Sequence, residues 1–238
     1  MTVRLAVFCV AVVVLQHSAS ARPAEETTGL GERASNVLDR FFQSGHPRLV
    51  SYRARRLLEA SSMSGRMSAS LDAWTFLDPD GTFRFEIVHE TGSAVIRQHV
   101  LIAALCAEQR GRDERELRAA ELTSSNYDFH VSPSAEQGRL TLGLIPKRHS
   151  PMLVDGAAVI NAADADLVRI EGRLAQPPSY WTRQVDIVRR YARIDGVRVA
   201  VEMRSRAEVR IAGESSFSMT YRYAMINGRA VEYSERSE

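Results

Sequence analysis

The chain has 238 residues and carries 31 Lys and Arg against 29 Asp and Glu, so its formal net charge is only +2. This balance provides no overall attraction to nucleic acid, and the length suits one domain with a substantial core better than two. All but one of the basic residues are Arg, which we attribute to codon usage because acidic residues nearly balance them.

The first residues have the pattern of a secretory signal peptide. Arg4 supplies positive charge, Leu5–Leu15 is an apolar core, and the Ala-Ser-Ala sequence that ends at Ala21 fits the small-residue rule for cleavage. The apolar run is too short for a membrane-spanning helix, which needs about 20 residues. We therefore expect a signal peptide over residues 1–21, cleavage near Ala21, one mature domain over residues 22–238, and a periplasmic or secreted location.

Cysteine usage is consistent with this expectation. Cleavage would leave Cys106 as the one cysteine of the mature chain, so no internal disulfide could form. The neighbours of Cys106 are Ala104, Leu105 and Ala107, which favours a buried structural thiol over an activated nucleophile.

The first predicted element is an amphipathic helix, which Gly45 and Pro47 would end. Its apolar residues recur at i, i+3, i+4, i+7 and i+8, the spacing of one helical face. These residues are Ala34, Val37, Leu38, Phe41 and Phe42.

Strands and a second helix follow. Val50–Ala60 reads as a strand, and residues 67–90 read as a hairpin around the turn sequence Asp-Pro-Asp-Gly at 78–81. The period then changes, and Val95–Gln109 has the wide apolar face of a well-buried helix. Residues 110–122 are dense in charge and read as a solvated segment.

From Asn126 onward the sequence reads as strands joined by short turns. Val197–Ile211 alternates apolar odd-numbered with mostly charged even-numbered residues, so one face of that strand should be buried and the other exposed. The predicted fold class is α+β and mostly antiparallel β: a curved open sheet, or half-barrel, with two helices covering its concave face. The other predicted strands are Tyr127–Val131, Arg139–Lys147, Ala157–Asn161, Leu167–Ala175, Trp181–Ile194 and Phe217–Ile226.

Catalytic and cofactor signatures are missing from the sequence. There is no G-x-S-x-G elbow, no phosphate-binding glycine loop and no H-x-H or H-E-x-x-H pattern. We therefore predict no enzyme activity, no catalytic residues, no cofactor and no metal site. Carboxylates distant in sequence could still form a glycosidase pair, and this alternative stays open.

Two local sequences suggest a rim around a binding site. Lys147 and Arg148 end one predicted strand, and Trp181 opens another after two prolines. At the mouth of a cavity, the two cations could contact an anionic head group and Trp181 could lie between dry and wet regions. The simpler interpretation is that these residues cap strand ends and form a turn.

The order of elements resembles the LolA/LolB-like superfamily of periplasmic half-barrels. The resemblance covers most of residues 32–228 and rests on the buried helix Val95–Gln109, placed after a hairpin, and on the L-x-L-x-L-x-P strand Leu140–Pro146. It implies a curved sheet around an apolar cavity with helices as a lid. Members of that group include lipoprotein carriers, lipid-binding exported proteins and the sensor domain of RseB-like regulators.

The resulting hypothesis is an exported, non-catalytic binding or carrier protein for an acyl chain or a lipidated partner. The alternative is a periplasmic protein-interaction or sensor module without a lipid ligand. We expect a lipid acyl chain or an envelope protein as partner, no nucleic acid, and no integral membrane location. The predicted cavity residues are Ile96, Val100, Leu101, Leu105, Val199, Val201, Met203, Phe217, Met219 and Tyr221.

Overall fold

A computed structural model of the chain describes residues 29–43, 47–110, 119–180, 182–210 and 213–231. The predicted signal peptide lies outside these residues, and so does Trp181. The helices are α1 (Gly29–Gln43) and a continuous helical segment made of α2 (Ala94–Ile96), η1 (Arg97–Ile102) and α3 (Ala103–Arg110), called the α2–α3 helix below.

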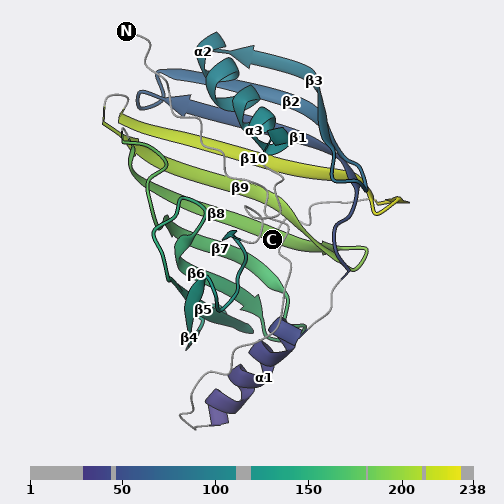
Figure 1. Cartoon of the computed structure of the whole chain (residues 1–238), viewed down its shortest axis with the longest axis vertical. Helices are drawn as coiled ribbons and strands as arrows, with labels where there is room; N and C mark the ends of the chain where they lie inside the picture. Colours follow the sequence, from purple (N-terminus) through teal and green to yellow (C-terminus); the bar gives the residue numbers. More distant parts are fainter. Residues whose placement is uncertain (1–28, 44–46, 111–118, 181, 211–212, 232–238) are drawn as a thin grey trace.

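The strands form one open antiparallel sheet of 11 members (Figure 1). Their order across the sheet is β3-β2-β1-β10-β9-β8-β7-β6-β5-β4, and the short β11 pairs with β10. Their bounds are β1 Tyr52–Ser62, β2 Met67–Leu77, β3 Phe83–Gly92, β4 Tyr127–Pro133, β5 Arg139–Pro146, β6 Val154–Asn161, β7 Leu167–Leu174, β8 Thr182–Ile194, β9 Val197–Val209, β10 Gly213–Ile226 and β11 Arg229–Ala230. The predicted fold class, a mostly antiparallel open sheet with two helices, is confirmed.

The sheet consists of two meanders joined side by side. Strands β1 to β3 form one, and β4 to β10 form the other. The junction is the long antiparallel pair β1–β10, in which Leu58 lies opposite Met219 and Ala60 opposite Phe217. The last long strand, β10, thus pairs with the first strand, β1. The α2–α3 helix and strand β4 lie at opposite ends of the sheet (Figure 1).

Alternating side chains give the sheet its two faces. In β2, residues 69, 71, 73, 75 and 77 are buried while the residues between them are half-exposed. In β9, Val197, Val199, Met203 and Ala207 are buried as the alternation predicts. Arg198, which the same alternation assigns to the exposed face, corrects that prediction, because its side chain is only 7% exposed and pairs with Asp166. Val201 is only partly buried, because the pairing of β8 with β9 passes from Glu202 directly to Ala200, which leaves Val201 in a β-bulge.

The predicted turns have the backbone that their sequences demand. Asp195 and Gly196 have φ of 49° and 80°, and Asn227 and Gly228 have φ of 48° and 79°. Two consecutive positive φ values are typical of a two-residue hairpin loop, which Asn or Asp followed by Gly adopts at low cost.

Both helices pack on the same face of the sheet, over separate apolar clusters. The first cluster lies beneath the α2–α3 helix and includes Ile96, Leu101 and Leu105. The second includes Val37, Leu38 and Phe41 of α1. Met203 belongs to the first cluster and Ala207 to the second, and these two residues point the same way from β9.

The α2–α3 helix is not uniform. The Ser93 side chain caps its start by accepting a hydrogen bond from the Ile96 backbone N–H, and residues 97–102 form a π-helical segment. Such segments are rare and often occur at functional sites. Among the described residues, no helix combines the length and the apolar character needed to cross a membrane.

Candidate functional site

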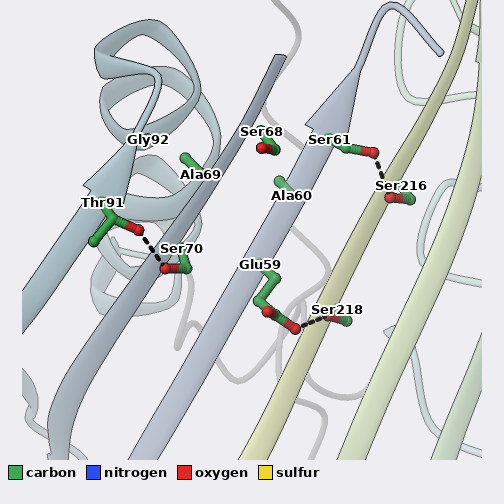
Figure 2. Close-up of a pocket in the computed structure, with 10 residues that line it drawn as sticks. All are labelled: Glu59, Ala60, Ser61, Ser68, Ala69, Ser70, Thr91, Gly92, Ser216 and Ser218. Atoms are coloured by element: carbon green, nitrogen blue, oxygen red, sulfur yellow. Dashed lines mark hydrogen bonds between the residues drawn. The ribbon is translucent and has the colours of Figure 1, made fainter. Parts of the chain in front are cut away.

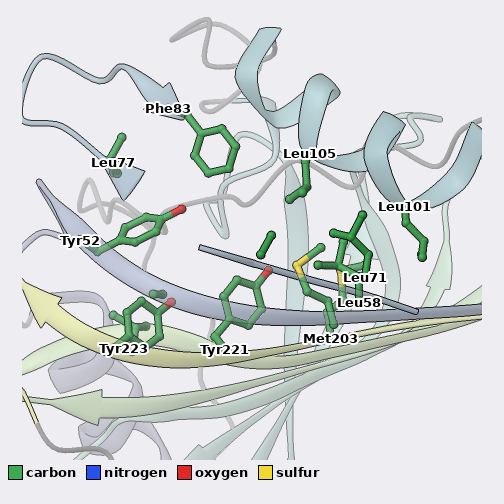
Figure 3. Close-up of a cluster of buried hydrophobic side chains, with 14 of the residues drawn as sticks. Tyr52, Leu58, Leu71, Leu77, Phe83, Leu101, Leu105, Met203, Tyr221 and Tyr223 are labelled. Atoms are coloured by element: carbon green, nitrogen blue, oxygen red, sulfur yellow. The ribbon is translucent and has the colours of Figure 1, made fainter. Parts of the chain in front are cut away.

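The ten predicted cavity residues come together in the first cluster. Eight are buried, while Val100 and Val201 are partly buried and pack against the others. Figure 3 shows Leu101 and Leu105 of the α2–α3 helix above Met203 and Tyr221 of the sheet. The sequence therefore identified ten residues of one contiguous apolar layer between the helix and the sheet. The role of this layer in ligand binding stays a prediction.

The first cluster is filled by its own side chains. Leu58 and Leu71 on the sheet and Leu101 and Leu105 on the helix all have no exposed surface. Cys106 is only partly buried, whereas the sequence favoured a buried thiol at this position. A guest could enter this layer only if the helix moved or side chains repacked.

An ion pair lies inside the same apolar layer. Arg56 of β1 is completely buried, and its two terminal nitrogens donate hydrogen bonds to the Glu108 carboxylate of α3 at 2.6 and 3.1 Å. Arg56 also donates to the Tyr52 hydroxyl. The pair therefore fixes the C-terminal end of the α2–α3 helix on the sheet.

Aromatic rings surround the Arg56 guanidinium. Its carbon lies 4.6 Å from the ring centre of Tyr221, 5.2 Å from that of Phe83 and 5.6 Å from that of Tyr52. Burial alone would lower the pKa of Arg56, but the charge and hydrogen bond of Glu108, together with Tyr52 and Tyr221, outweigh burial, and the pKa of Arg56 is raised well above its usual value. The arginine is thus a permanent buried cation.

Sequence analysis missed this ion pair, although β1 contains a signal for it. Tyr52, Ala54, Leu58 and Ala60 are apolar at alternate positions, and Arg56 is the one charged residue in that series. Arg189 has the same kind of position in β8, between the buried Ile187 and the partly buried Tyr191. A charge at a position that the period assigns to the core indicates a buried polar contact.

A second buried carboxylate lies near α1. Asp166, in the turn before β7, accepts hydrogen bonds from Arg193 at 2.8 Å and from Arg198 at 2.6 Å. Burial would raise the pKa of Asp166, but the two guanidinium groups outweigh it and lower the pKa. The guanidinium carbon of Arg198 also lies 5.2 Å from the ring centre of Phe41, which connects the carboxylate to α1.

The predicted rim residues bind local backbone and side-chain groups. Lys147 donates to the carbonyl oxygen of Ser124 and pairs with Asp128 at 3.1 Å. Arg148 donates to the side chain of Asn126 and to the carbonyl oxygen of Ala119. These contacts tie the segment before β4 to the end of β5, as the simpler interpretation of a strand cap requires.

A hollow lies on the opposite face of the sheet, away from both helices. Its volume is about 430 Å³, and it extends over β3, β2, β1 and β10 (Figure 2). It is lined by Glu59, Ala60, Ser61, Ser68, Ala69, Ser70, Thr91, Gly92, Ser216 and Ser218. Sequence analysis did not single out these serines. Alternation within a strand shows which face a side chain lies on, but it does not show which strands are neighbours in the sheet.

Metal-binding side chains do not converge in the described part of the chain. Within it, no three His, Cys, Asp or Glu side chains lie close enough to hold a metal ion. The two buried carboxylates described above, Glu108 and Asp166, are each held by arginine. This arrangement suits structural support or binding.

Comparisons with known proteins find similarity to solved structures. No protein-family model matches the chain, and no curated protein matches it significantly. Among solved structures, it is similar to a DUF1329 family protein from Desulfovibrio piger, with 11% sequence identity over 87% of this chain and 92% of that chain. The TM-score is 0.35, so the proposals below rest on the geometry of this chain alone. Membership of the half-barrel superfamily stays a prediction.

Proposed function

We propose that this chain is an exported, non-catalytic binding protein that holds an acyl chain or a lipidated partner on the helix-covered face of its sheet. One observation carries the proposal. A single face of an open sheet bears two apolar clusters, and each cluster is covered by one helix rather than by a second sheet. Movement of one helix would expose a long apolar surface without breaking any pairing between strands.

The free energy available to a guest supports this proposal. Burying about ten CH₂ groups gains roughly 8 kcal/mol before the costs of association are deducted. Those costs include the displacement of the helix side chains that now fill the layer. Micromolar binding of an acyl chain is compatible with this balance.

A fluorescent fatty-acid probe tests the proposal. Ala104 is partly buried against the first cluster, so Ala104→Trp should fill space that the probe needs and weaken its binding more than it weakens folding. The matched control is Thr220→Trp, which adds the same side chain on the other face of β10. Comparable weakening by both variants, after correction for stability, would contradict a site beneath the helix.

A specific feature favours the alternative, a protein-interaction module. In the described sheet, β3 is an end strand whose one neighbour is β2. Ile87 and Val88 in β3, and Val95 in the adjacent helix, are about half-exposed. An extended segment of a partner could pair with this edge and cover these side chains.

The two functions predict different results for the same protein. If the wild-type chain binds no fatty-acid probe saturably and carries no lipid after purification, we would abandon the carrier function for the interaction module. Val88→Asp should then abolish capture of an envelope partner. Under the carrier function, the same substitution should leave probe binding unchanged, because Val88 is outside the first cluster.

A further inference from the structure

The hollow on the face opposite the helices is a candidate for a second activity. Its side chains belong to positions that alternate with buried ones: Ser61 follows buried Ala60, Ser70 follows buried Ala69, and Ser216 precedes buried Phe217. These hydroxyls therefore point away from the apolar clusters. Small side chains on four neighbouring strands leave the surface hollowed, with a volume in the range of small-molecule sites.

Six of the ten lining residues carry a hydroxyl group. Ser61 and Ser216 hydrogen-bond across the β1–β10 pair at 2.8 Å, and Ser70 and Thr91 do so across β2–β3 at 2.8 Å (Figure 2). Ser218 donates to Glu59 at 3.4 Å. Each hydroxyl has one donor and two acceptor sites, so these contacts orient the groups and leave hydrogen-bonding capacity for a ligand.

Strand pairing arranges the hydroxyls in two rows. Thr91, Ser70, Glu59 and Ser218 lie opposite one another in successive strands. Ser68, Ser61 and Ser216 form the second row, two residues further along the strands. Neighbouring strands are about 4.8 Å apart, so a ligand crossing them would meet polar groups at a regular interval.

The same lining excludes other ligand classes. Among the residues that the structure describes, no arginine or lysine lines the hollow, and Glu59 would repel an anion, so a phosphate or a lipid head group is disfavoured. The apolar lining consists of Ala60, Ala69 and Gly92, which offer too little surface for an acyl chain. What remains is a neutral ligand rich in hydroxyl groups.

We propose that this hollow binds a neutral linear glycan that crosses strands β3, β2, β1 and β10. The sugar hydroxyls would exchange hydrogen bonds with the two rows, and Glu59 would accept from one of them. This site is independent of the acyl-chain site, because it lies on the opposite face of the sheet.

Titration calorimetry with chitohexaose, cellohexaose and maltohexaose tests the proposal. We expect saturable binding of at least one of them. Ser70→Ala and Ser216→Ala, which remove a hydroxyl without adding bulk, should each weaken that binding about tenfold, the value of one hydrogen bond. The matched control is Thr220→Val, on the same face of β10 but outside the lining, which should change binding less than twofold.

Folding is checked separately by thermal unfolding of each variant. If the wild-type chain binds none of the three oligosaccharides at millimolar concentration, the proposal is overturned. It is also overturned if Thr220→Val weakens binding as much as Ser70→Ala does. The fatty-acid titration described above is unaffected by either outcome, so the two proposals fail or succeed separately.

Discussion

The two apolar clusters share one face of the sheet, yet their helices are attached by different means. The α2–α3 helix contributes buried leucines and, in addition, reaches the buried pair Arg56–Glu108. Helix α1 contributes apolar side chains that include Phe41, on which Arg198 stacks, and its exposed Arg40 donates hydrogen bonds to the carbonyl oxygens of Ala162 and Ala163. A buried ion pair within an apolar layer defines the position of a helix more strictly than apolar contacts and exposed hydrogen bonds do.

Removal of the buried carboxylate should have the largest effect. Glu108→Ala leaves Arg56 buried without its partner and should cost about 3–5 kcal/mol in the free energy of unfolding. The double variant Arg56→Met with Glu108→Leu should recover most of that loss, since apolar side chains can replace a buried ion pair. Urea unfolding measures both. A cost below about 1 kcal/mol for the single variant would show that the pair does not anchor the helix.

Truncation of the anchor of α1 should have a smaller and more local effect. Phe41→Ala removes a side chain that has no exposed surface and should cost about 3 kcal/mol. Because α1 has no buried ion pair of its own, we expect its amide protons to exchange rapidly in this variant. Protection of the α2–α3 helix should stay at the wild-type level. Equal loss of protection in both helices would mean that the clusters unfold as one unit.

The contribution of the Asp166 carboxylate, near α1, should be visible as a loss of stability at acid pH. The pKa of Asp166 is lowered in the folded chain, so its contribution to stability is present above about pH 4 and is lost as the pH falls through the lowered pKa. Asp166→Asn should cost about 1–3 kcal/mol at neutral pH. Its stability should also fall less than that of the wild type between pH 4 and pH 2. Parallel pH profiles for the two proteins would contradict the assignment.

The smallest effect is expected on the exposed side of β9. Glu202 pairs with Arg190 at 3.5 Å and with Arg204 at 2.5 Å, near the surface and on the face without helices. Glu202→Ala should therefore cost about 1 kcal/mol or less. Met203→Asp, at the next position, should cost several times more because it buries a carboxylate in the first cluster. Similar costs at the two positions would show that the two faces are assigned wrongly.

Local patterns in the sequence predicted much of this fold. The alternation in β2 and β9 and the turn pairs Asp195-Gly196 and Asn227-Gly228 act over a few residues, and the structure shows them at the expected places. The pairing of β1 with β10 was beyond reach, because it joins residues more than 150 positions apart and no local period reports it. The bulge at Val201 was missed for a related reason, since it depends on the register of the neighbouring strand.

The candidate sites divide in the same way. The apolar pattern of each strand and helix identified Ile96, Leu101, Met203 and Tyr221 as core residues, and the structure shows them in one cluster. The Arg56–Glu108 contact and the hydroxyl-lined hollow arise where separate elements meet, so a one-dimensional pattern could not pair their members. The one signal in the sequence was Arg56, a charged residue at a position that the alternation of β1 assigns to the core.

Mass spectrometry of small molecules that remain with the purified protein tests the central claim, that the helix-covered face binds an acyl chain. The mature chain, exported and purified without detergent, should release fatty acids or phospholipids in near-stoichiometric amounts on denaturation. Glu108→Ala, with its α2–α3 helix less firmly held, should carry a different amount, and the matched outer-face variant Thr220→Trp should match the wild type. Wild-type protein that is free of lipid, and that stays so after incubation with phospholipid vesicles, would contradict the account.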